Sequence, residues 1–240
     1  MEQLANKLTQ WIKEQVLEAK KTGTVVGLSG GIDSAVVAVL CKRAFPDTTL
    51  AAILPCYSNK MDVAHAYKVS MKFKIRTELV ELDPAYDLLI RILPQGEDYH
   101  TNDKLAQVNV KPRLRMITLY YLATQLNYLV VGTGNRSEIA IGYYTKYGDG
   151  GVDLLPIGNL VKRQVKELAE YLEIPREIIN KPPSAGLWEG QTDEGEMGLK
   201  YEELDRYLTA GESSDIVKTK IEAMAAGSTH KRIMPQLPPF

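Results

Sequence analysis

Apolar runs that alternate with helical patterns constrain the fold of this chain more than any other feature. The run Thr24–Leu28 is continuous and rich in β-branched residues, which is typical of a strand buried on both faces. Similar strands are expected at Leu50–Leu54, Ile75–Leu82 and Leu129–Val131. Strands that alternate with helices predict an α/β fold, a doubly wound and mostly parallel sheet flanked by helices.

Apolar residues at helical spacing and prolines that open helices predict the helices. These are expected within Leu4–Leu17, over Asp33–Ala44 and Met61–Lys74, from Pro84, from Pro112 to Asn127, over Asn159–Leu172, and near Lys200–Leu208 and Ser213–Ala226. A polar loop is expected over Pro94–Asp103. No repeat or linker interrupts the sequence, so we expect one domain over residues 1–240.

The charge balance excludes a global attraction to nucleic acid or to a membrane surface, because 29 Lys and Arg face 30 Asp and Glu. No apolar run approaches the length of a membrane span. The cysteines, Cys41 and Cys56, are too few and wrongly spaced for a CxxC metal or redox site. We therefore expect a cytoplasmic protein with reduced thiols.

A glycine-rich segment, Ser29–Ser34, follows the first strand. Ligands of doubly wound sheets bind beyond the carboxyl ends of the strands, and glycines let backbone N–H groups approach an anion there. The lysine of a Walker loop is missing, whereas Asp33 lies inside the anion site. This aspartate is a candidate Mg²⁺ ligand; the alternative is a capping residue of the next helix.

A second glycine-rich segment, Gly132–Glu138, follows the fourth strand. We expect Glu138 to meet Asp33 across one metal ion, with Thr133 donating to a nucleotide. The charged segment Gly142–Asp153 comes next and is either part of the site or a solvated loop.

Cations lie where a helix start disfavours them. Lys162 and Arg163 fall in the first turn of the helix expected from Asn159, and Lys111, Arg113 and Arg115 crowd the start of another. A bound anion, for which phosphate is the natural candidate, would remove this conflict.

Two segments near the C-terminus have no periodicity. Lys181–Trp188, continuing through Gln191–Glu194, is rich in Pro, Gly and acid, and a long loop of this kind is often a lid. The cluster His230–Arg232 is basic and is either a binding site or a solvated tail.

Ser29–Ser34 resembles the SGGxDS loop of the N-type ATP pyrophosphatases, a group with an adenine nucleotide alpha-hydrolase-like fold. The segments Asn109–Arg115, Gly132–Glu138, Gly142–Asp153 and Pro182–Glu194 resemble the NAD synthetases specifically. The resemblance covers nearly the whole chain. Pro112 stands where many members have alanine, and its fixed φ is tolerated at a helix start.

The resemblance implies roles for individual residues. Asp33 and Glu138 would hold Mg²⁺, and Asp33, Lys162 and Thr133 would act in catalysis. The implied ATP-binding residues are Gly27, Leu28, Ser29, Gly30, Gly31, Ile32, Asp33, Ser34, Thr133, Lys162 and Ser184. The implied residues for the second substrate, deamido-NAD, are Arg113, Lys146, Asp153, His230 and Lys231.

The implied reaction begins when the nicotinate carboxylate attacks the α-phosphate of ATP, which releases pyrophosphate and leaves an acyl-adenylate. Ammonia then displaces AMP and gives NAD. Two anions must meet, so metal ions and lysines are needed, and no nucleophilic side chain is required. The resemblance also implies a homodimer with the dinucleotide near the subunit interface, and a mobile loop at Pro182–Gly198.

Three alternatives make different predictions. A tRNA-thiolating enzyme would need catalytic or metal-binding cysteines and an RNA-binding charge excess. A nucleotide sensor would bind ATP without releasing pyrophosphate. A glutamine-hydrolysing amidotransferase would need an extra domain, for which 240 residues leave no room, so the expected nitrogen source is free ammonia or ammonia from a separate partner.

Overall fold

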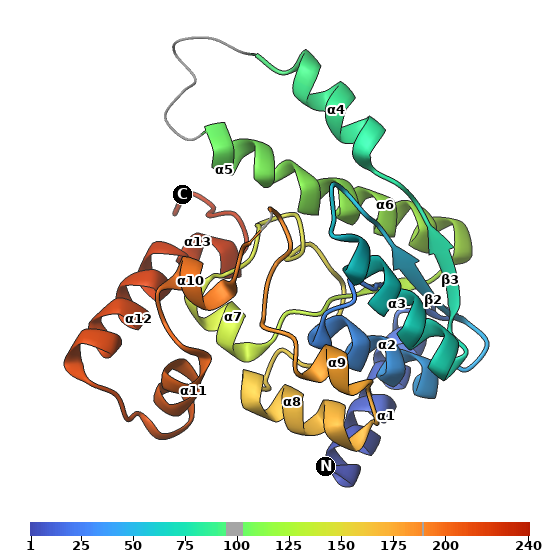
Figure 1. Cartoon of the computed structure of the whole chain (residues 1–240), viewed down its shortest axis with the longest axis horizontal. Helices are drawn as coiled ribbons and strands as arrows, with labels where there is room; N and C mark the ends of the chain where they lie inside the picture. The colour runs from blue at the N-terminus through green and yellow to red at the C-terminus, as the bar shows by residue number, and fades with distance from the viewer. Residues whose placement is uncertain (95–102, 189) are drawn as a thin grey trace.

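The computed structural model describes residues 1–94, 103–188 and 190–240, so the predicted loop Pro94–Asp103 falls largely outside the described residues. Its sheet has four parallel strands in the order β3-β2-β1-β4, of which β2 and β3 are labelled in Figure 1. The strands are β1 (Thr24–Gly27), β2 (Thr49–Ile53), β3 (Arg76–Leu79) and β4 (Leu129–Val131). The predicted strands and their parallel arrangement are confirmed.

Helices surround this sheet. They are α1 (Glu2–Glu18), α2 (Ile32–Ala44), α3 (Lys60–Phe73), α4 (Asp83–Ile92), α5 (Asp103–Val108), α6 (Val110–Leu126), α7 (Arg136–Ile141), α8 (Lys162–Tyr171), α9 (Arg176–Ile179), α10 (Asp193–Met197), α11 (Tyr201–Ala210), α12 (Asp215–Gly227) and α13 (Thr229–Arg232). None of the described helices is both long and apolar enough to cross a membrane.

The sheet is covered on both faces, as a doubly wound fold requires. Val26 of β1 packs into the core that it shares with α1, α2, α3, α8 and α9. Its neighbour Val25 packs on the opposite face, against side chains of α6. Successive residues of a strand point to opposite faces, so a strand with apolar residues on both faces reads as a continuous apolar run.

The direction in which strands are added to the sheet reverses at β1, although β1 and β4 run parallel. β1, β2 and β3 succeed one another on one side, whereas β4 pairs with the other side of β1. The loops that follow β1 and β4 therefore diverge at a topological switch point, which is where ligands bind in open parallel sheets.

The helix that was predicted from Asn159 begins later, at Lys162. Its first free N–H groups find partners from distant segments. Lys162 N donates to Ser137 Oγ at 3.1 Å, and Arg163 N donates to Asp205 Oδ2 at 2.8 Å. Such partners fix a helix start, and sequence spacing alone does not reveal them.

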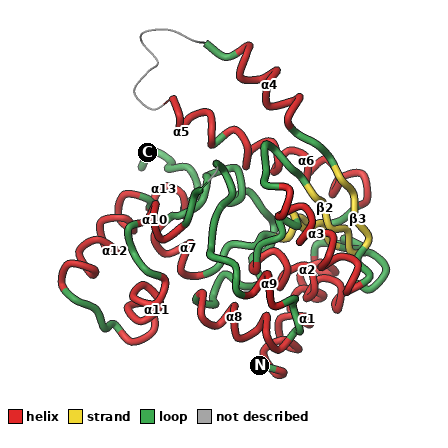
Figure 2. Tube along the Cα trace, viewed as in Figure 1, coloured by secondary structure: helices red, strands yellow, loops and turns green. Residues whose placement is uncertain are grey.

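A smaller apolar cluster joins the C-terminal helices to α7. Ile141 of α7 packs with residues of α10–α12, among them Met197, Tyr201, Leu204 and Ile221. Figure 2 shows loops rather than helices in the middle of the molecule, between this C-terminal group and the sheet. These loops carry most of the segments singled out by the sequence.

Candidate active site

A cavity of about 430 Å³ opens at the carboxyl ends of β1 and β4. Its walls come from the loops after both strands, from α6, from the segment Lys181–Trp188 and from Lys231 near the C-terminus. Segments far apart in the sequence therefore meet in one hollow at the switch point of the sheet.

The loop after β1 has the geometry of an anion-binding turn. Gly30 has φ +80°, and a Cβ there would lie 2.1 Å from the carbonyl oxygen of Asp62, so the position requires glycine. Ser34 Oγ lies 3.0 Å from Ser29 Oγ and accepts from Ser29 N at 3.2 Å, which closes the turn. This leaves the start of α2 open to the cavity.

Asp33 is not the cap of α2, so that alternative interpretation is wrong. Gly31 occupies the N-cap position and makes no side-chain cap hydrogen bond. The Asp33 carboxylate instead accepts from Asn135 Nδ2 at 3.0 Å through Oδ1. Its second oxygen faces the centre of the site.

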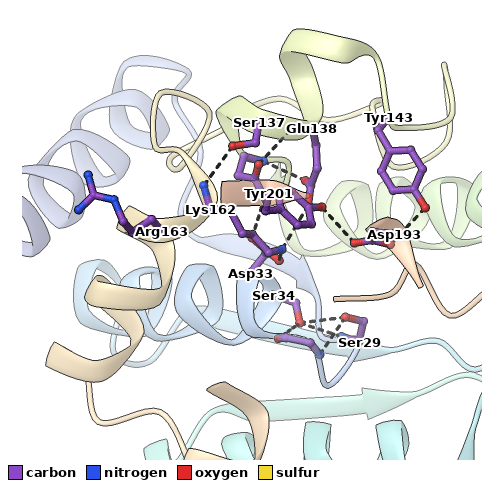
Figure 3. A network of polar contacts seen from close by, with 12 residues as sticks. Ser29, Asp33, Ser34, Ser137, Glu138, Tyr143, Lys162, Arg163, Asp193 and Tyr201 are labelled. Carbon is purple, nitrogen blue, oxygen red and sulfur yellow. Dashed lines mark hydrogen bonds and ion pairs between the residues drawn. The ribbon is translucent and has the colours of Figure 1, made fainter. Parts of the chain in front are cut away.

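Lys162 joins the two predicted metal ligands (Figure 3). Its ammonium lies 2.6 Å from Asp33 Oδ2 and 3.4 Å from Glu138 Oε1. The three side chains are only 12–18% exposed. The other Glu138 oxygen accepts from Asn135 N at 3.1 Å as part of a capping box that starts α7. The predicted meeting of Asp33 and Glu138 is therefore observed, here across the Lys162 ammonium.

Burial and charge set the protonation of this triad. Burial alone would lower the pKa of Lys162, but Asp33 and Glu138 together raise it, so the lysine stays cationic. Burial and the nearby Asp33 raise the pKa of Glu138, and Lys162 opposes that rise. Asp33 is the closer partner of the lysine, and Glu138 protonates more readily than an exposed glutamate does.

The donor set fits a magnesium ion in part. No group of three or more His, Cys, Asp or Glu side chains suited to a metal occurs among the described residues. Two carboxylates, from the helices that follow the adjacent strands β1 and β4, nevertheless reach one cation, here the Lys162 ammonium. Mg²⁺ is usually held by one or two carboxylates plus substrate phosphates and water, so this pair would suffice once a nucleotide supplied further oxygens.

A network behind the triad was not predicted. The Tyr201 hydroxyl donates to Asp193 Oδ2 at 3.1 Å and lies 3.4 Å from Glu138 Oε1. Tyr143 lies on the other side of Asp193, with its hydroxyl 3.2 Å from Oδ1 and 2.7 Å from Glu196 Oε2 (Figure 3). Burial raises the pKa of Asp193. The spacing of Asn135 and Glu138 is a capping-box signal that could have been found, whereas nothing in the sequence marks Tyr201.

The predicted ATP-binding residues line the cavity with one exception. Gly27–Ser34 do so apart from Gly30, and Thr133, Lys162 and Ser184 do so as well. Lys231 also lines it and donates to the carbonyls of Gly142 and Tyr144, both at 2.7 Å.

The other four predicted deamido-NAD residues lie outside the cavity wall. Arg113 Nη2 contacts the carbonyl oxygen of Lys146 at 3.4 Å, and Lys146 Nζ donates to the carbonyl of His230 at 2.5 Å. Asp153 accepts from Val130 N at 2.8 Å and from Tyr120 Oη at 3.0 Å. Three of the four thus form one contact chain beside the cavity, and Asp153 is held apart from it.

The cations at the start of α6 have partners within the protein. Lys111 donates to the carbonyl of Leu187 at 2.8 Å and lies over the rings of Tyr57 and Tyr86. Arg115 donates to the carbonyl of Leu54 at 3.1 Å. A bound anion is therefore not needed to explain these charges, although Arg115 also lines the cavity.

The cavity can position and neutralise anions but offers no side-chain nucleophile. No cysteine or histidine occurs in its wall as far as the described residues form it. Both thiols, Cys41 and Cys56, are buried elsewhere. Asp149 does reach the cavity; it accepts from Thr145 N at 2.8 Å, and burial raises its pKa. This favours group transfer between bound substrates, driven by orientation and charge.

Comparison with known proteins agrees with this geometry. Residues 4–235 match the family model described as NAD synthase. The NH₃-dependent NAD⁺ synthetase of Carboxydothermus hydrogenoformans is 52% identical over 237 residues, 99% of this chain and 97% of that protein. An NMN synthetase from Francisella tularensis superposes with a TM-score of 0.93 and 38% identity, over 100% and 98% of the two chains. The NH₃-dependent NAD synthetase from Campylobacter jejuni, in complex with nitrate, gives 0.80 and 30%, over 99% and 98%.

Proposed function

The chain belongs to the NAD synthase family, and we propose that the cavity at the ends of β1 and β4 is its active site. The protein is a ligase that forms a C–N bond. It amidates deamido-NAD with ammonia and ATP, releasing AMP and pyrophosphate, in the last step of NAD biosynthesis. The observation that supports the location is the convergence of Asp33, Glu138 and Lys162 beside the glycine turn.

Asp33 and Glu138 are the residues that would hold Mg²⁺. They are largely buried carboxylates in the first turns of α2 and α7, the helices that follow the adjacent strands β1 and β4, and both line the cavity. A bound magnesium ion would neutralise part of the phosphate charge. Lys162 would then give up a carboxylate contact and turn its ammonium to the nucleotide.

The first step joins two anions. An oxygen of the nicotinate carboxylate attacks the α-phosphorus of ATP, and the bond from that phosphorus to the bridging oxygen breaks, so pyrophosphate leaves with the electron pair. Lys162 offsets the charge that gathers there, and the N–H groups of the glycine turn orient the phosphates. Thr133 and Ser184, both in the cavity wall, contact ATP.

The second step replaces AMP with nitrogen. Ammonia attacks the carbonyl carbon of the acyl-adenylate, AMP leaves with its oxygen, and one ammonia proton is lost. Lys231 binds the nicotinate half of deamido-NAD inside the cavity. Arg113, Lys146, Asp153 and His230, which lie outside the wall, bind the part of the dinucleotide that extends beyond it.

The homodimer is supported by an exposed apolar face on α6. Arg113, Ile117 and Tyr121 recur at helical spacing and are all exposed, Ile117 to 58% and Tyr121 to 64%. A dinucleotide-binding arginine thus shares one face with apolar side chains that a second copy would cover. Analytical ultracentrifugation should give twice the mass of 26.8 kDa, and a monomer at micromolar concentration would contradict the dimer.

The chain acts as one unit in the cytoplasm under this proposal. Tyr201, from the C-terminal helix cluster, reaches Glu138 beside the sheet, so the site needs both parts of the chain. The buried thiols Cys41 and Cys56 are unpaired, which suits a reducing compartment.

A second substrate is supported by the similarity to the NMN synthetase, whose TM-score of 0.93 exceeds the 0.80 of the NAD synthetase with similar coverage. Amidation of nicotinic acid mononucleotide by the same chemistry would give NMN. That substrate lacks the adenylate half that we assign to the residues outside the cavity.

The decisive assay combines the protein with ATP, Mg²⁺, ammonium and either deamido-NAD or nicotinic acid mononucleotide. With deamido-NAD, we expect NAD, AMP and pyrophosphate in equal amounts, and formation of ADP would overturn the mechanism. A kcat/KM that is higher for the mononucleotide would make NMN synthesis the main activity.

A further inference from the structure

Lys181 is a cation of the cavity for which the proposed reaction has no role. Among the described residues of the wall, four are cationic: Arg115, Lys162, Lys181 and Lys231. Arg115 donates to carbonyl and hydroxyl oxygens, and Lys231 donates to two carbonyls. Lys162 pairs with the carboxylates of Asp33 and Glu138. Lys181 forms an ion pair with Asp62 of α3, and its side chain is 28% exposed.

We propose that Lys181 binds the β- and γ-phosphates of ATP and then the leaving pyrophosphate, and that Asp62 holds the lysine in place until they arrive. This inference rests on the proposed function, because it assigns the lysine to the phosphates of that reaction. Lys181 thereby adds, from a distant segment, a second cation beside Lys162 at a turn that has no lysine of its own.

The position of Asp62 supports this role. Its carbonyl oxygen lies 2.1 Å from where a Cβ of Gly30 would be, so the backbone of Asp62 lies directly against the glycine turn. The lysine ammonium that its carboxylate holds is therefore about one side-chain length from the turn. Asp62 Oδ2 also lies 3.7 Å from the Cβ position of Gly186, so the aspartate contacts both the turn and the segment that carries Lys181.

The charges of the wall explain why the phosphates would attract this lysine. Six carboxyl groups line the described part of the cavity against four cations: Asp33, Asp62, Glu138, Asp149, Asp193 and Glu196. A polyphosphate that enters such a site needs every available cation. Lys181 can exchange a single carboxylate for a more highly charged anion, and lysine is a flexible point charge suited to that exchange.

A purely structural ion pair is the competing explanation, and it makes a different prediction. If the pair were only structural, Lys181→Met and Asp62→Asn would break the same ion pair and change the pyrophosphate affinity in the same way. In contrast, our proposal makes the two substitutions opposite in effect, since Asp62 competes with phosphate for the lysine.

The test is calorimetric titration of the whole protein with inorganic pyrophosphate and Mg²⁺, with AMP as a second ligand. We expect Lys181→Met to weaken pyrophosphate binding by about 10-fold to 100-fold, the loss of one charge-assisted hydrogen bond. Lys181→Arg should keep most of the affinity, and Asp62→Asn should tighten pyrophosphate binding. AMP affinity should be the same in all of them, because AMP has no β- or γ-phosphate.

Lys68→Met is the matched control, because Lys68 of α3 forms an exposed ion pair with Glu177 and lies outside the cavity. Equal losses of pyrophosphate affinity in Lys181→Met and Asp62→Asn would overturn the inference, as would unchanged affinity in Lys181→Met. Pyrophosphate binding needs no turnover, so a failure of the amidation assay with intact pyrophosphate binding would count against the proposed function and not against Lys181.

Discussion

Gly30→Ala and Gly31→Ala give a sharp test of the turn that follows β1, because the structure predicts very different costs for adjacent residues. At Gly30, an alanine would have to adopt φ +80° with its Cβ 2.1 Å from the backbone oxygen of Asp62. The left-handed conformation costs about 1–2 kcal/mol, and overpacking against an atom that cannot rotate away costs about 1–3 kcal/mol. Together the two costs predict that Gly30→Ala lowers the free energy of unfolding by about 2–5 kcal/mol.

At Gly31, the same substitution meets no such conflict. Gly31 has φ −89°, and its Cβ would lie 3.4 Å from Ser29 Oγ. Alanine is a poorer N-cap than glycine, so we expect a loss of about 1 kcal/mol or less.

Equilibrium unfolding in urea measures the two free energies, and an unchanged m-value shows that the unfolded states are comparable. The Gly30 variant should also raise the KM for ATP, because relief of the clash moves the start of α3 away from the turn. Equal stability losses in the two variants would refute the argument, since only the backbone and space around Gly30 differ.

Further predictions concern the triad, its support and the dinucleotide. Tyr201→Phe removes a hydrogen bond to a carboxylate, which contributes about 1.5–3 kcal/mol, so kcat/KM should fall about tenfold or more. The control Tyr207→Phe loses only a surface hydrogen bond to Glu222 and should stay active. Equal activities of the two variants would remove Tyr201 from the site. Glu138→Gln should reduce turnover sharply and alter its Mg²⁺ dependence, which a magnesium titration measures. Burial raises the pKa of Glu138 in the folded state, so the protonated carboxyl favours folding below its ordinary pKa of 4.5, and this stabilisation is lost as the pH rises towards the raised value. Glu138→Gln should flatten that part of the pH–stability curve, and an unchanged slope would contradict the argument. Arg113→Ala should raise the KM for deamido-NAD roughly tenfold and more than the KM for ATP, and equal effects would argue against its role.

The sequence was sufficient where a local pattern determines the structure. Strands buried on both faces and the glycine turn have such patterns, so the meeting of Asp33 and Glu138 could be predicted. The neighbour relation of β1 and β4 then places their following loops side by side.

Features that depend on long-range packing could not be predicted. Tyr201 reaches Glu138 only because α10 and α11 pack on α7. Likewise, Lys111 lies over Tyr57 and Tyr86 rather than before an anion because β2, α4 and α6 meet there. Such contacts join residues whose separation in the sequence gives no signal.

The wide spacing of the triad and its support along the chain has a consequence for synthesis. Asp33, Glu138, Lys162 and Tyr201 leave the ribosome in that order, and the sheet is complete once β4 has emerged. A nascent chain therefore has its whole sheet and its glycine turn before it has the lysine and tyrosine that complete the site. Recovery of activity on refolding should therefore report the docking of the last third of the chain, which carries Lys162 and Tyr201, rather than formation of the sheet.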